Sequence, residues 1–267
     1  MVSAGGVPSF SLRGKVIILI GGSGLLGRAL VTSLAGAGAT LIITSRDRSR
    51  AEAIAAEERT AGRSVYPETA DLEAGESDML ALRDRVLPAH PRIDGLVFNA
   101  AYKQPMKQGW SSPLAGWETS MQVNATGFFA TLRAFGEVMA GQGGGSVVAI
   151  ASMQGLVGQN PWLYEGTAMF TAPDYFFHKA GMLNLTRYSA THYGARRVRV
   201  NAVAPGGIYN RDQPQAPAFL ERFAKMTALG RMADPVEITG AVIFLLSDAS
   251  TYVTGSTLTV DGGYTAR

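Results

Sequence analysis

The chain has 267 residues, of which 46% are hydrophobic and 17% are charged, so its composition is typical of a compact globular protein and excludes a disordered one. The net charge is only +3 with dispersed basic residues, which argues against nucleic acid as a partner, because that partner needs a broad basic face. The absence of cysteine excludes disulfides and thiolate chemistry. The sequence has no segment of signal-peptide type and no run of about 18 apolar residues, so we expect a cytoplasmic protein with no membrane span.

Residues 15–20 form an apolar, β-branched run that is typical of a strand buried on both faces of a parallel sheet. A glycine-rich turn follows at once, and then a helical pattern over residues 28–35. Gly22, Gly24 and Gly27 satisfy the G-x-G-x-x-G pattern in this strand–turn–helix context. Such a turn lets backbone N–H groups and the helix N-terminus approach a pyrophosphate. We therefore expect a dinucleotide phosphate site here; the alternative is a flexible loop without a ligand.

The next strand, residues 40–44, ends at Ser45 and Arg46. In a dinucleotide fold this strand end meets the adenosine ribose, where an acidic residue binds the 2′-hydroxyl of NAD and an arginine can pair with the 2′-phosphate of NADP. Asp47 comes only after Arg46. The sequence therefore favours NADP(H) over NAD(H); the alternative is that Arg46 is a solvated loop charge.

Strands and helices then alternate along the chain. We expect further strands at residues 64–69, 93–98, 146–151, 198–203 and 256–260. We expect helices at residues 48–61, 76–87, 117–140, 174–193, 219–227 and 235–246. This alternation predicts one α/β domain over residues 1–267, a single-domain Rossmann fold with a doubly wound parallel sheet of about seven strands and helices on both faces. Its cofactor half spans about residues 12–150, and its substrate-site elements span about residues 151–230.

A candidate proton-transfer pair lies in the predicted helix at residues 174–193. Tyr175 and Lys179 are four residues apart, so their side chains share one helix face. An ammonium beside a phenol favours the phenolate, which suits proton transfer near neutrality. The spacing alone is a weak signal, because an ordinary helix face shows it too. Ser152 follows the fifth strand, and the irregular stretch at residues 153–173 between it and Tyr175 is of a length often found at functional sites.

Five landmarks together make a specific pattern that covers nearly the whole chain. In order, they are the glycine-rich turn at residues 21–27, Asp71 after the third strand, Asn99-Ala100-Ala101 after the fourth, Ser152 with Tyr175 and Lys179, and Pro205-Gly206 after the sixth strand. The pattern resembles the single-domain branch of the short-chain dehydrogenase/reductase family. The resemblance implies an NAD(P)(H)-dependent oxidoreductase that interconverts a secondary alcohol and a ketone by hydride transfer.

The resemblance also assigns roles to individual residues. Tyr175 would be the general acid/base, and Lys179 would hold the nicotinamide ribose and stabilise the phenolate. Ser152 would bind the substrate oxygen, and Asn124 would place a water that links Lys179 to solvent. The implied cofactor-binding residues are Gly21, Ser23, Gly24, Leu26, Gly27, Ser45, Arg46, Asp71, Leu72, Asn99, Ala100, Tyr175, Lys179, Pro205, Gly206 and Ile208. The expected substrate contacts are Ser152, Gln154, Trp162, Tyr164 and Tyr175.

Three features depart from the family pattern. Ile20 and Leu25 replace a threonine and a glycine of the usual turn, and residues 206–210 lack the threonine often found after Pro-Gly. The stretch between Ser152 and Tyr175 is longer than usual and should line the substrate site. Tyr164 lies nearer the usual spacing, but Ala168 rather than a lysine follows four residues later, so Tyr164 is kept only as a substrate contact.

The glycine-rich turn, the long stretch after Ser152 and residues 205–210 are also similar to bacterial oxidoreductases of sialic- or legionaminic-acid-type sugar synthesis, which favours a polar, sugar-like substrate. A non-catalytic nucleotide-binding or scaffold protein of the same fold is the main alternative, and an isomerase or dehydratase is another. The histidines are scattered, so no metal site is expected. The family further implies a homo-oligomer, a tetramer or dimer, formed through the helices at 117–140 and 174–193 and the last strand.

Overall fold

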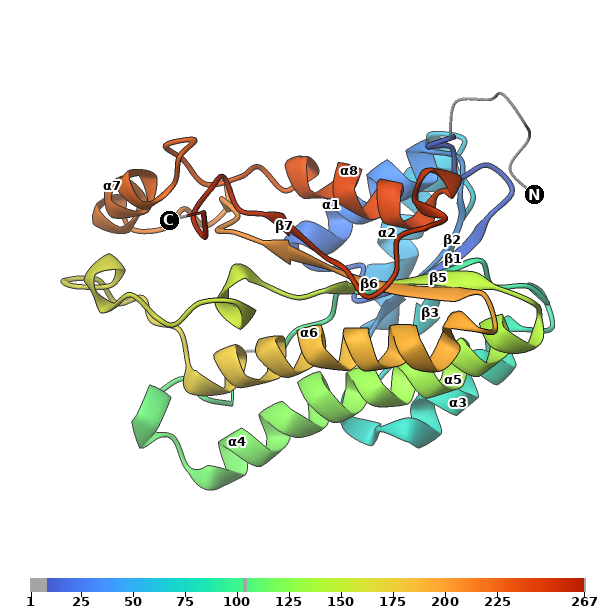
Figure 1. Cartoon of the computed structure of the whole chain (residues 1–267), viewed down its shortest axis with the longest axis horizontal. Helices are drawn as coiled ribbons and strands as arrows, with labels where there is room; N and C mark the ends of the chain where they lie inside the picture. The colour runs from blue at the N-terminus through green and yellow to red at the C-terminus, as the bar shows by residue number, and fades with distance from the viewer. Residues whose placement is uncertain (1–8, 103–104, 267) are drawn as a thin grey trace.

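The computed structural model describes residues 9–102 and 105–266. One parallel sheet of seven strands forms its centre, in the order β3-β2-β1-β4-β5-β6-β7 (Figure 1). The strands are β1 Val16–Ile20, β2 Thr40–Ser45, β3 Val65–Thr69, β4 Gly95–Phe98, β5 Gly145–Ile150, β6 Val198–Pro205 and β7 Thr257–Val260. The strand order reverses between β1 and β4, which is where a doubly wound sheet opens a crevice for a ligand. The predicted fold class is confirmed.

Helices cover both faces of this sheet (Figure 1). On one face lie α1 Leu25–Gly36, α2 Arg48–Thr60 and α8 Val236–Leu246; on the other lie α3 Glu76–Val86, α5 Gly127–Gly141 and α6 Pro173–Gly194. The remaining helices are α4 Leu114–Met121, just before α5, and α7 Pro217–Met226, beyond the sheet and near the C-terminus. Within the two described ranges, every helix is too short or too polar to span a bilayer.

Alternate residues of the central strands pack against opposite helix layers. In β1, Ile18 and Ile20 belong to the core on the side of α3, α5 and α6, whereas Ile17 and Leu19 belong to the core on the side of α1, α2 and α8. All four side chains are buried. This two-sided burial explains why the strand is a continuous apolar run and not an alternating one.

A third and smaller group of apolar side chains lies outside these two cores. It joins the stretch after β5, α7 and the C-terminal segment, and we call it the loop–α7 cluster. Its buried members are Met153, Leu163, Phe219, Phe223 and Tyr264. The cluster forms part of the wall of the cleft described below.

Local sequence signals explain the starts of two helices and the position of a proline in the sheet. The Asp47 side chain accepts a hydrogen bond from the Arg50 backbone N–H at 3.2 Å and so caps α2. Pro173 occupies the first turn of α6, where its missing N–H costs nothing. Pro67 is in β3, an edge strand, where one side of the strand makes no ladder.

The helical region predicted at residues 117–140 is present from Leu114 to Gly141, but it is not a uniform α-helix. Residues from 114 onward form α4, then a π-helical turn over Gln122–Thr126, and then α5. Neither glycine nor proline marks this turn before Gly127, so no local breaker signals it. Asn124 stands in the turn, and its side-chain amide donates to the backbone carbonyl of Ser120 at 3.0 Å. Most other element ends agree with the sequence prediction to within a few residues, and the stretch at 153–173 holds two short 3-10 turns, Met153–Gly155 and Pro161–Leu163.

Candidate functional site

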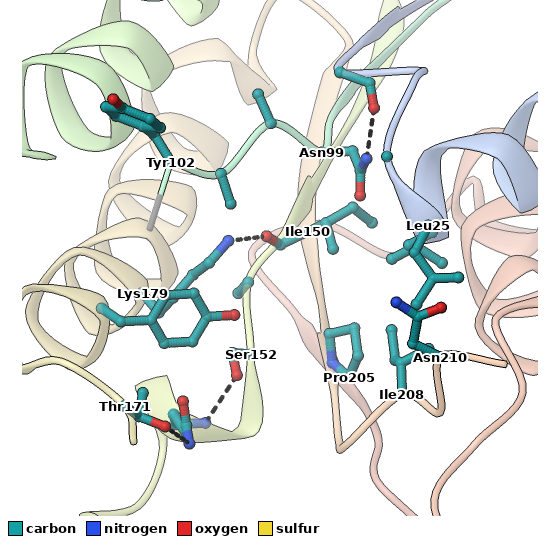
Figure 2. Close-up of a pocket in the computed structure, with 18 of the residues that line it drawn as sticks. Leu25, Asn99, Tyr102, Ile150, Ser152, Thr171, Lys179, Pro205, Ile208 and Asn210 are labelled. Carbon is teal, nitrogen blue, oxygen red and sulfur yellow. Dashed lines mark hydrogen bonds between the residues drawn. The ribbon is translucent and has the colours of Figure 1, made fainter. Parts of the chain in front are cut away.

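A cleft of about 1000 Å3 lies at the carboxyl ends of the strands (Figure 2). The chain leaves β1, β2, β3, β4, β5 and β6 at this edge, so segments that are far apart in the sequence meet there. Most residues expected from the sequence line the cleft: Gly21, Ser23, Gly24, Leu26, Ser45, Arg46, Asp71, Leu72, Asn99, Ala100, Ser152, Gln154, Tyr164, Tyr175, Lys179, Pro205, Gly206 and Ile208. Gly27, Asn124 and Trp162 do not line it.

The glycine-rich turn needs glycine for two different reasons. Gly21 has a φ of +89°, and a Cβ there would lie 2.8 Å from the Ala100 backbone. At Gly27 a Cβ would clash with the Gly21 carbonyl oxygen, so this residue permits close packing of α1 on the turn. The Cβ direction of Gly24 has no atom within 4 Å, and Gly24 lines the cleft just before α1. The turn therefore leaves an open cradle at a helix N-terminus, which fits a bound phosphate.

The side chain of Asn99 supports this turn from the end of β4. Its Nδ2 donates to the Gly21 carbonyl oxygen at 2.7 Å (Figure 2). Asp71, after β3, caps a short 3-10 turn, because its Oδ1 accepts from the Glu73 N–H at 3.0 Å. Both side chains thus fix backbone segments that form the cleft.

The end of β2 presents positive charge. Arg46 and Arg50 line the cleft, and within the described part of the chain neither has an ion pair. The carboxylate of Asp47 is engaged by α2, and a hydrogen bond from the Ser49 hydroxyl, followed by one from the Arg50 backbone, lowers its pKa. Ser45 lies deeper, with its Oγ 3.2 Å from that of Ser23.

Ser152, Tyr175 and Lys179 line the same cleft. Figure 2 shows Ser152 and Lys179 in it. The Lys179 Nζ lies 5.6 Å from the centroid of the Tyr175 ring and donates to the Ile150 carbonyl oxygen at 2.6 Å. Lys179 is only 2% exposed, so its ammonium is held in place at the end of β5. The Ser152 Oγ accepts from the Gln154 backbone N–H at 3.2 Å, which leaves its own hydrogen free to donate.

Asn124 is buried behind the cleft and does not face it. Its Oδ1 accepts from the Tyr102 N–H at 2.9 Å, and its Nδ2 donates to the Tyr102 carbonyl at 2.9 Å. Both bonds tie the π-helical turn to the segment after β4. The side chain therefore positions a cleft-lining residue, since Tyr102 itself lines the cleft.

The segment after β6 closes the cleft on the side of α1 and α8. Pro205, Gly206 and Ile208 line it, and a Cβ on Gly206 would lie 2.7 Å from the Asp261 Cα. The Gln215 side chain donates to the Ile208 carbonyl at 2.9 Å and braces this segment. Asn210, which the sequence did not single out, also lines the cleft beside Pro205 and Ile208 (Figure 2).

Trp162 is the expected substrate residue that the structure does not bring into the cleft. Its ring lies under the guanidinium of Arg222 on α7, with the Cζ 5.7 Å from the ring centroid, and Arg222 also donates to the Trp162 carbonyl oxygen at 3.0 Å. The sequence could not show this, because the partner comes from a helix 60 residues later. Gln154 and Tyr164, by contrast, line the cleft as expected.

Some cleft residues escaped sequence reasoning, among them Lys107, Thr171 and Asp174. Asp174 is only 1% exposed; its Oδ2 accepts from the Ser120 hydroxyl at 2.5 Å, and its Oδ1 makes no hydrogen bond to any described residue. An acidic residue in the first turn of a helix is ordinary in sequence, so nothing there signals its burial. In residues 9–102 and 105–266 no group of three or more His, Asp or Glu side chains could hold a metal ion.

Comparisons with known proteins agree with this geometry. A family model described as enoyl-(acyl carrier protein) reductase matches residues 23–265. A solved structure of a short-chain type dehydrogenase/reductase from Mycobacterium marinum has a TM-score of 0.84 and 29% identity, covering 97% of this chain and 98% of that chain. The galactitol 2-dehydrogenase (L-tagatose-forming) of Cereibacter sphaeroides is 32% identical over 260 residues, 96% of this chain and 97% of that protein.

The chain belongs to the short-chain dehydrogenase/reductase family. Another short-chain dehydrogenase/reductase neighbour is a gluconate 5-dehydrogenase from Burkholderia cenocepacia, solved with NADP and tartrate. It has a TM-score of 0.87 and 28% identity, covering 98% of this chain and 99% of that chain. The predicted family and oxidoreductase class are thus confirmed. The finer resemblance to sialic- or legionaminic-acid enzymes is not confirmed.

Proposed function

We propose that this chain interconverts a secondary alcohol and a ketone on a polyhydroxylated, sugar-like substrate and prefers NADP(H). One observation carries the proposal: Tyr175 and Lys179 lie together in a cleft whose other end is a glycine-rich turn, with Ser152 on the adjacent strand end. A nucleotide-binding protein without catalysis would not need these three side chains at the inner end of the cleft.

The residues divide the chemistry among them. A bound nicotinamide dinucleotide supplies the hydride donor or acceptor. Tyr175 takes the proton of the substrate hydroxyl in oxidation and returns it to the carbonyl oxygen in reduction. Ser152 donates its free hydroxyl hydrogen to that same oxygen. The fixed ammonium of Lys179 is a positive charge beside the ring, so it favours the phenolate form of Tyr175.

The cleft offers a place for each part of the dinucleotide. The cradle at Gly24 and the N-terminus of α1 suit the pyrophosphate, and Asn99 keeps that turn in shape. Asp71 and Leu72 line the cleft, and we assign them to the adenine, as the family resemblance implies. The nicotinamide end would then lie against four other cleft residues, Ala100, Pro205, Gly206 and Ile208. The water expected at Asn124 stays a prediction. In the structure the side chain of Asn124 makes hydrogen bonds to the Tyr102 backbone.

The preference for NADP(H) rests on the end of β2. Arg46 and Arg50 both line the cleft, as Ser45 does, while the nearby Asp47 carboxylate caps α2. A 2′-phosphate can accept hydrogen bonds from a guanidinium, whereas a 2′-hydroxyl gains little from one. The gluconate 5-dehydrogenase neighbour, which was solved with NADP, supports the same preference.

A polyhydroxylated substrate is supported by the names of the relatives and by the lining of the cleft. Galactitol and gluconate are both polyhydroxylated. Gln154, Tyr164 and Thr171 add polar groups close to Ser152. A purely apolar substrate would leave these groups without partners, which is unfavourable in a partly buried site.

The test is a coupled measurement of turnover and cofactor binding. The wild type is expected to reduce NADP+ with galactitol or gluconate, or to oxidise NADPH with the corresponding keto compounds. Tyr175→Phe is expected to lose about 100- to 10,000-fold in kcat, with a far smaller change in the Kd for NADPH. Tyr66→Phe, on the edge strand β3 and outside the cleft, is the matched control. Equal inactivity of wild type and Tyr175→Phe across the panel, with cofactor still bound, would favour the non-catalytic alternative. Product formed without net change in NADPH would favour an isomerase or dehydratase.

We further propose that the chain forms a homo-oligomer through α5 and α6. Three large side chains on these helices are exposed: Phe129 by 46%, Phe177 by 60% and Tyr188 by 68%. Exposed apolar groups gathered on long helices favour contact with a second copy. Light scattering after size-exclusion chromatography would distinguish tetramer, dimer and monomer. The cytoplasmic location expected from the sequence stays a prediction.

A further inference from the structure

Three polar side chains from the long stretch between Ser152 and Tyr175 meet in the cleft. The Tyr164 Oη and the Thr171 Oγ1 lie 2.7 Å apart, and the Gln154 Nε2 lies 3.4 Å from each of them. We call them the Gln–Tyr–Thr cluster. Figure 2 shows Thr171 close to Ser152, on the side of the cleft that holds Lys179.

The cluster leaves hydrogen-bonding capacity open toward the cleft. Tyr164 and Thr171 have two hydroxyl hydrogens between them, and their mutual bond uses one. The two contacts of the Gln154 amide nitrogen are at the long limit for hydrogen bonds, and its Oε1 bonds to no described residue. All three side chains are half-buried and line the cleft. The cluster therefore offers at least one donor and one acceptor, which is what a single alcohol group can satisfy.

The position of the cluster is fixed relative to the reacting oxygen. The Gln154 backbone N–H donates to the Ser152 Oγ at 3.2 Å, so the two residues are locked together. Thr171 lies one residue before Ala172, whose carbonyl accepts from the Tyr175 N–H at 3.1 Å at the start of α6. Both ends of the cluster are thus tied to residues that would hold the substrate oxygen.

Apolar packing holds the cluster in shape. The Tyr164 ring packs on Phe219 of α7, with ring centroids 5.4 Å apart, and so is anchored to the loop–α7 cluster. Its hydroxyl is thereby held in the cleft at little further cost in side-chain entropy. A rigid donor–acceptor group of this kind discriminates strongly, because a substrate that lacks the matching hydroxyl leaves the polar atoms unpaired.

We propose that the Gln–Tyr–Thr cluster binds the hydroxyl on the carbon next to the reacting carbon, so that the enzyme selects vicinal diols over simple secondary alcohols. This inference rests on the proposed function, since it concerns the same reaction. It assigns a specificity role to Thr171 and a joint role to the three side chains.

The test compares two substrates that differ by one hydroxyl, butane-2,3-diol (each stereoisomer) and butan-2-ol (each enantiomer). For the wild type we expect kcat/KM to be at least about tenfold higher for the best diol. Thr171→Val and Tyr164→Phe, which keep the side-chain shape, should each lower the diol-to-butanol ratio by about 2- to 12-fold, the effect of one neutral hydrogen bond. The double variant should bring the ratio close to one.

Thr167→Val is the matched control. Thr167 lies in the same stretch, but its hydroxyl donates to the Tyr164 carbonyl at 2.8 Å and it does not line the cleft. The control should keep the wild-type ratio. A merely structural role for the cluster would lower the melting temperature and both kcat/KM values together while the ratio stayed constant, and that result would overturn the inference.

A binding measurement separates this inference from the proposed function. Calorimetry of Tyr175→Phe with saturating NADP+ should give tighter binding of butane-2,3-diol than of butan-2-ol, and adding Thr171→Val and Tyr164→Phe should remove the difference. If the wild type turned over no alcohol but this difference held, the proposed function would fail, while the assignment of the Gln–Tyr–Thr cluster as a binding group for the second hydroxyl would stand. Equal binding of the two alcohols, or binding of neither, would overturn the inference.

Discussion

Cofactor selectivity at Arg46 gives the sharpest test of the site. Three arginines follow β2 within five residues, yet they differ in surroundings. Arg46 and Arg50 line the cleft, whereas Arg48 does not and pairs with Glu52 at 2.8 Å. We therefore compare Arg46→Ala with Arg48→Ala, which removes the same side chain and the same charge two residues away.

The expected size follows from the exposure of Arg46. A hydrogen bond to a charged group contributes about 1.5–3 kcal/mol, or about 10- to 150-fold in Kd. Arg46 is exposed, and at physiological salt charges are screened over about 8 Å, so the low end applies. Arg46→Ala should weaken NADPH binding by about tenfold and NADH binding by less than about twofold. Loss of its stacking on Tyr102, 5.1 Å from the ring centroid, affects both cofactors alike and cancels in the ratio.

The assay is a fluorescence titration of each variant with NADPH and NADH at about 0.02 and about 0.2 M salt. Charges are screened weakly at the lower concentration and strongly at the higher one. The Arg46→Ala effect on NADPH should shrink at the higher salt, and Arg48→Ala should match the wild type. Equal weakening of both cofactors by Arg46→Ala, or an equal loss of NADPH affinity in Arg48→Ala, would refute the reasoning about the 2′-phosphate.

Three further predictions concern the scaffold. Gly27→Ala should lower the free energy of unfolding by about 1–3 kcal/mol and weaken cofactor binding, because its Cβ would meet the glycine-rich turn; denaturant melts and titration check this. Ser120→Ala should lower the free energy of unfolding by about 1–3 kcal/mol in the same melts, because the Asp174 side chain loses its one hydrogen bond to a described residue. Ser77→Ala, which removes an exposed hydroxyl, is the control and should change the free energy of unfolding little. Burial raises the pKa of Tyr193 to about 12, so the contribution of this residue to the free energy of unfolding is complete below pH 10 and is lost as the pH rises toward 12. In Tyr193→Phe the free energy of unfolding should therefore fall less steeply between pH 10 and 12 than in the wild type. The same pH dependence in both proteins would contradict this prediction.

The sequence alone could predict those parts of the site that depend on a local pattern of residues. The strand before the glycine-rich turn is apolar throughout because both of its faces are buried, and Gly27 is required by packing within the turn itself. Tyr175 and Lys179 share a helix face by spacing alone, so their meeting could be predicted.

Other parts depend on contacts between distant segments and leave no local pattern. The π-helical turn at Gln122–Thr126 has no breaker residue, and Asn124 there bonds to Tyr102, which comes before α4. Trp162 lies outside the cleft and contacts Arg222 of α7. Asp174 is buried and accepts a hydrogen bond from Ser120 of α4. The partners in these contacts are far apart in the sequence, so only the tertiary structure reveals them.

The loop–α7 cluster has a consequence for how such an enzyme can change over evolutionary time. Its buried members are separate from the two cores that hold the sheet to its helices. Cooperative units of this kind can open locally without global unfolding, so amide hydrogens of α7 should exchange sooner than those of β5. Replacements there can reshape substrate preference while the thermodynamic stability of the sheet is largely conserved, which allows one scaffold to diversify its substrates without becoming fragile.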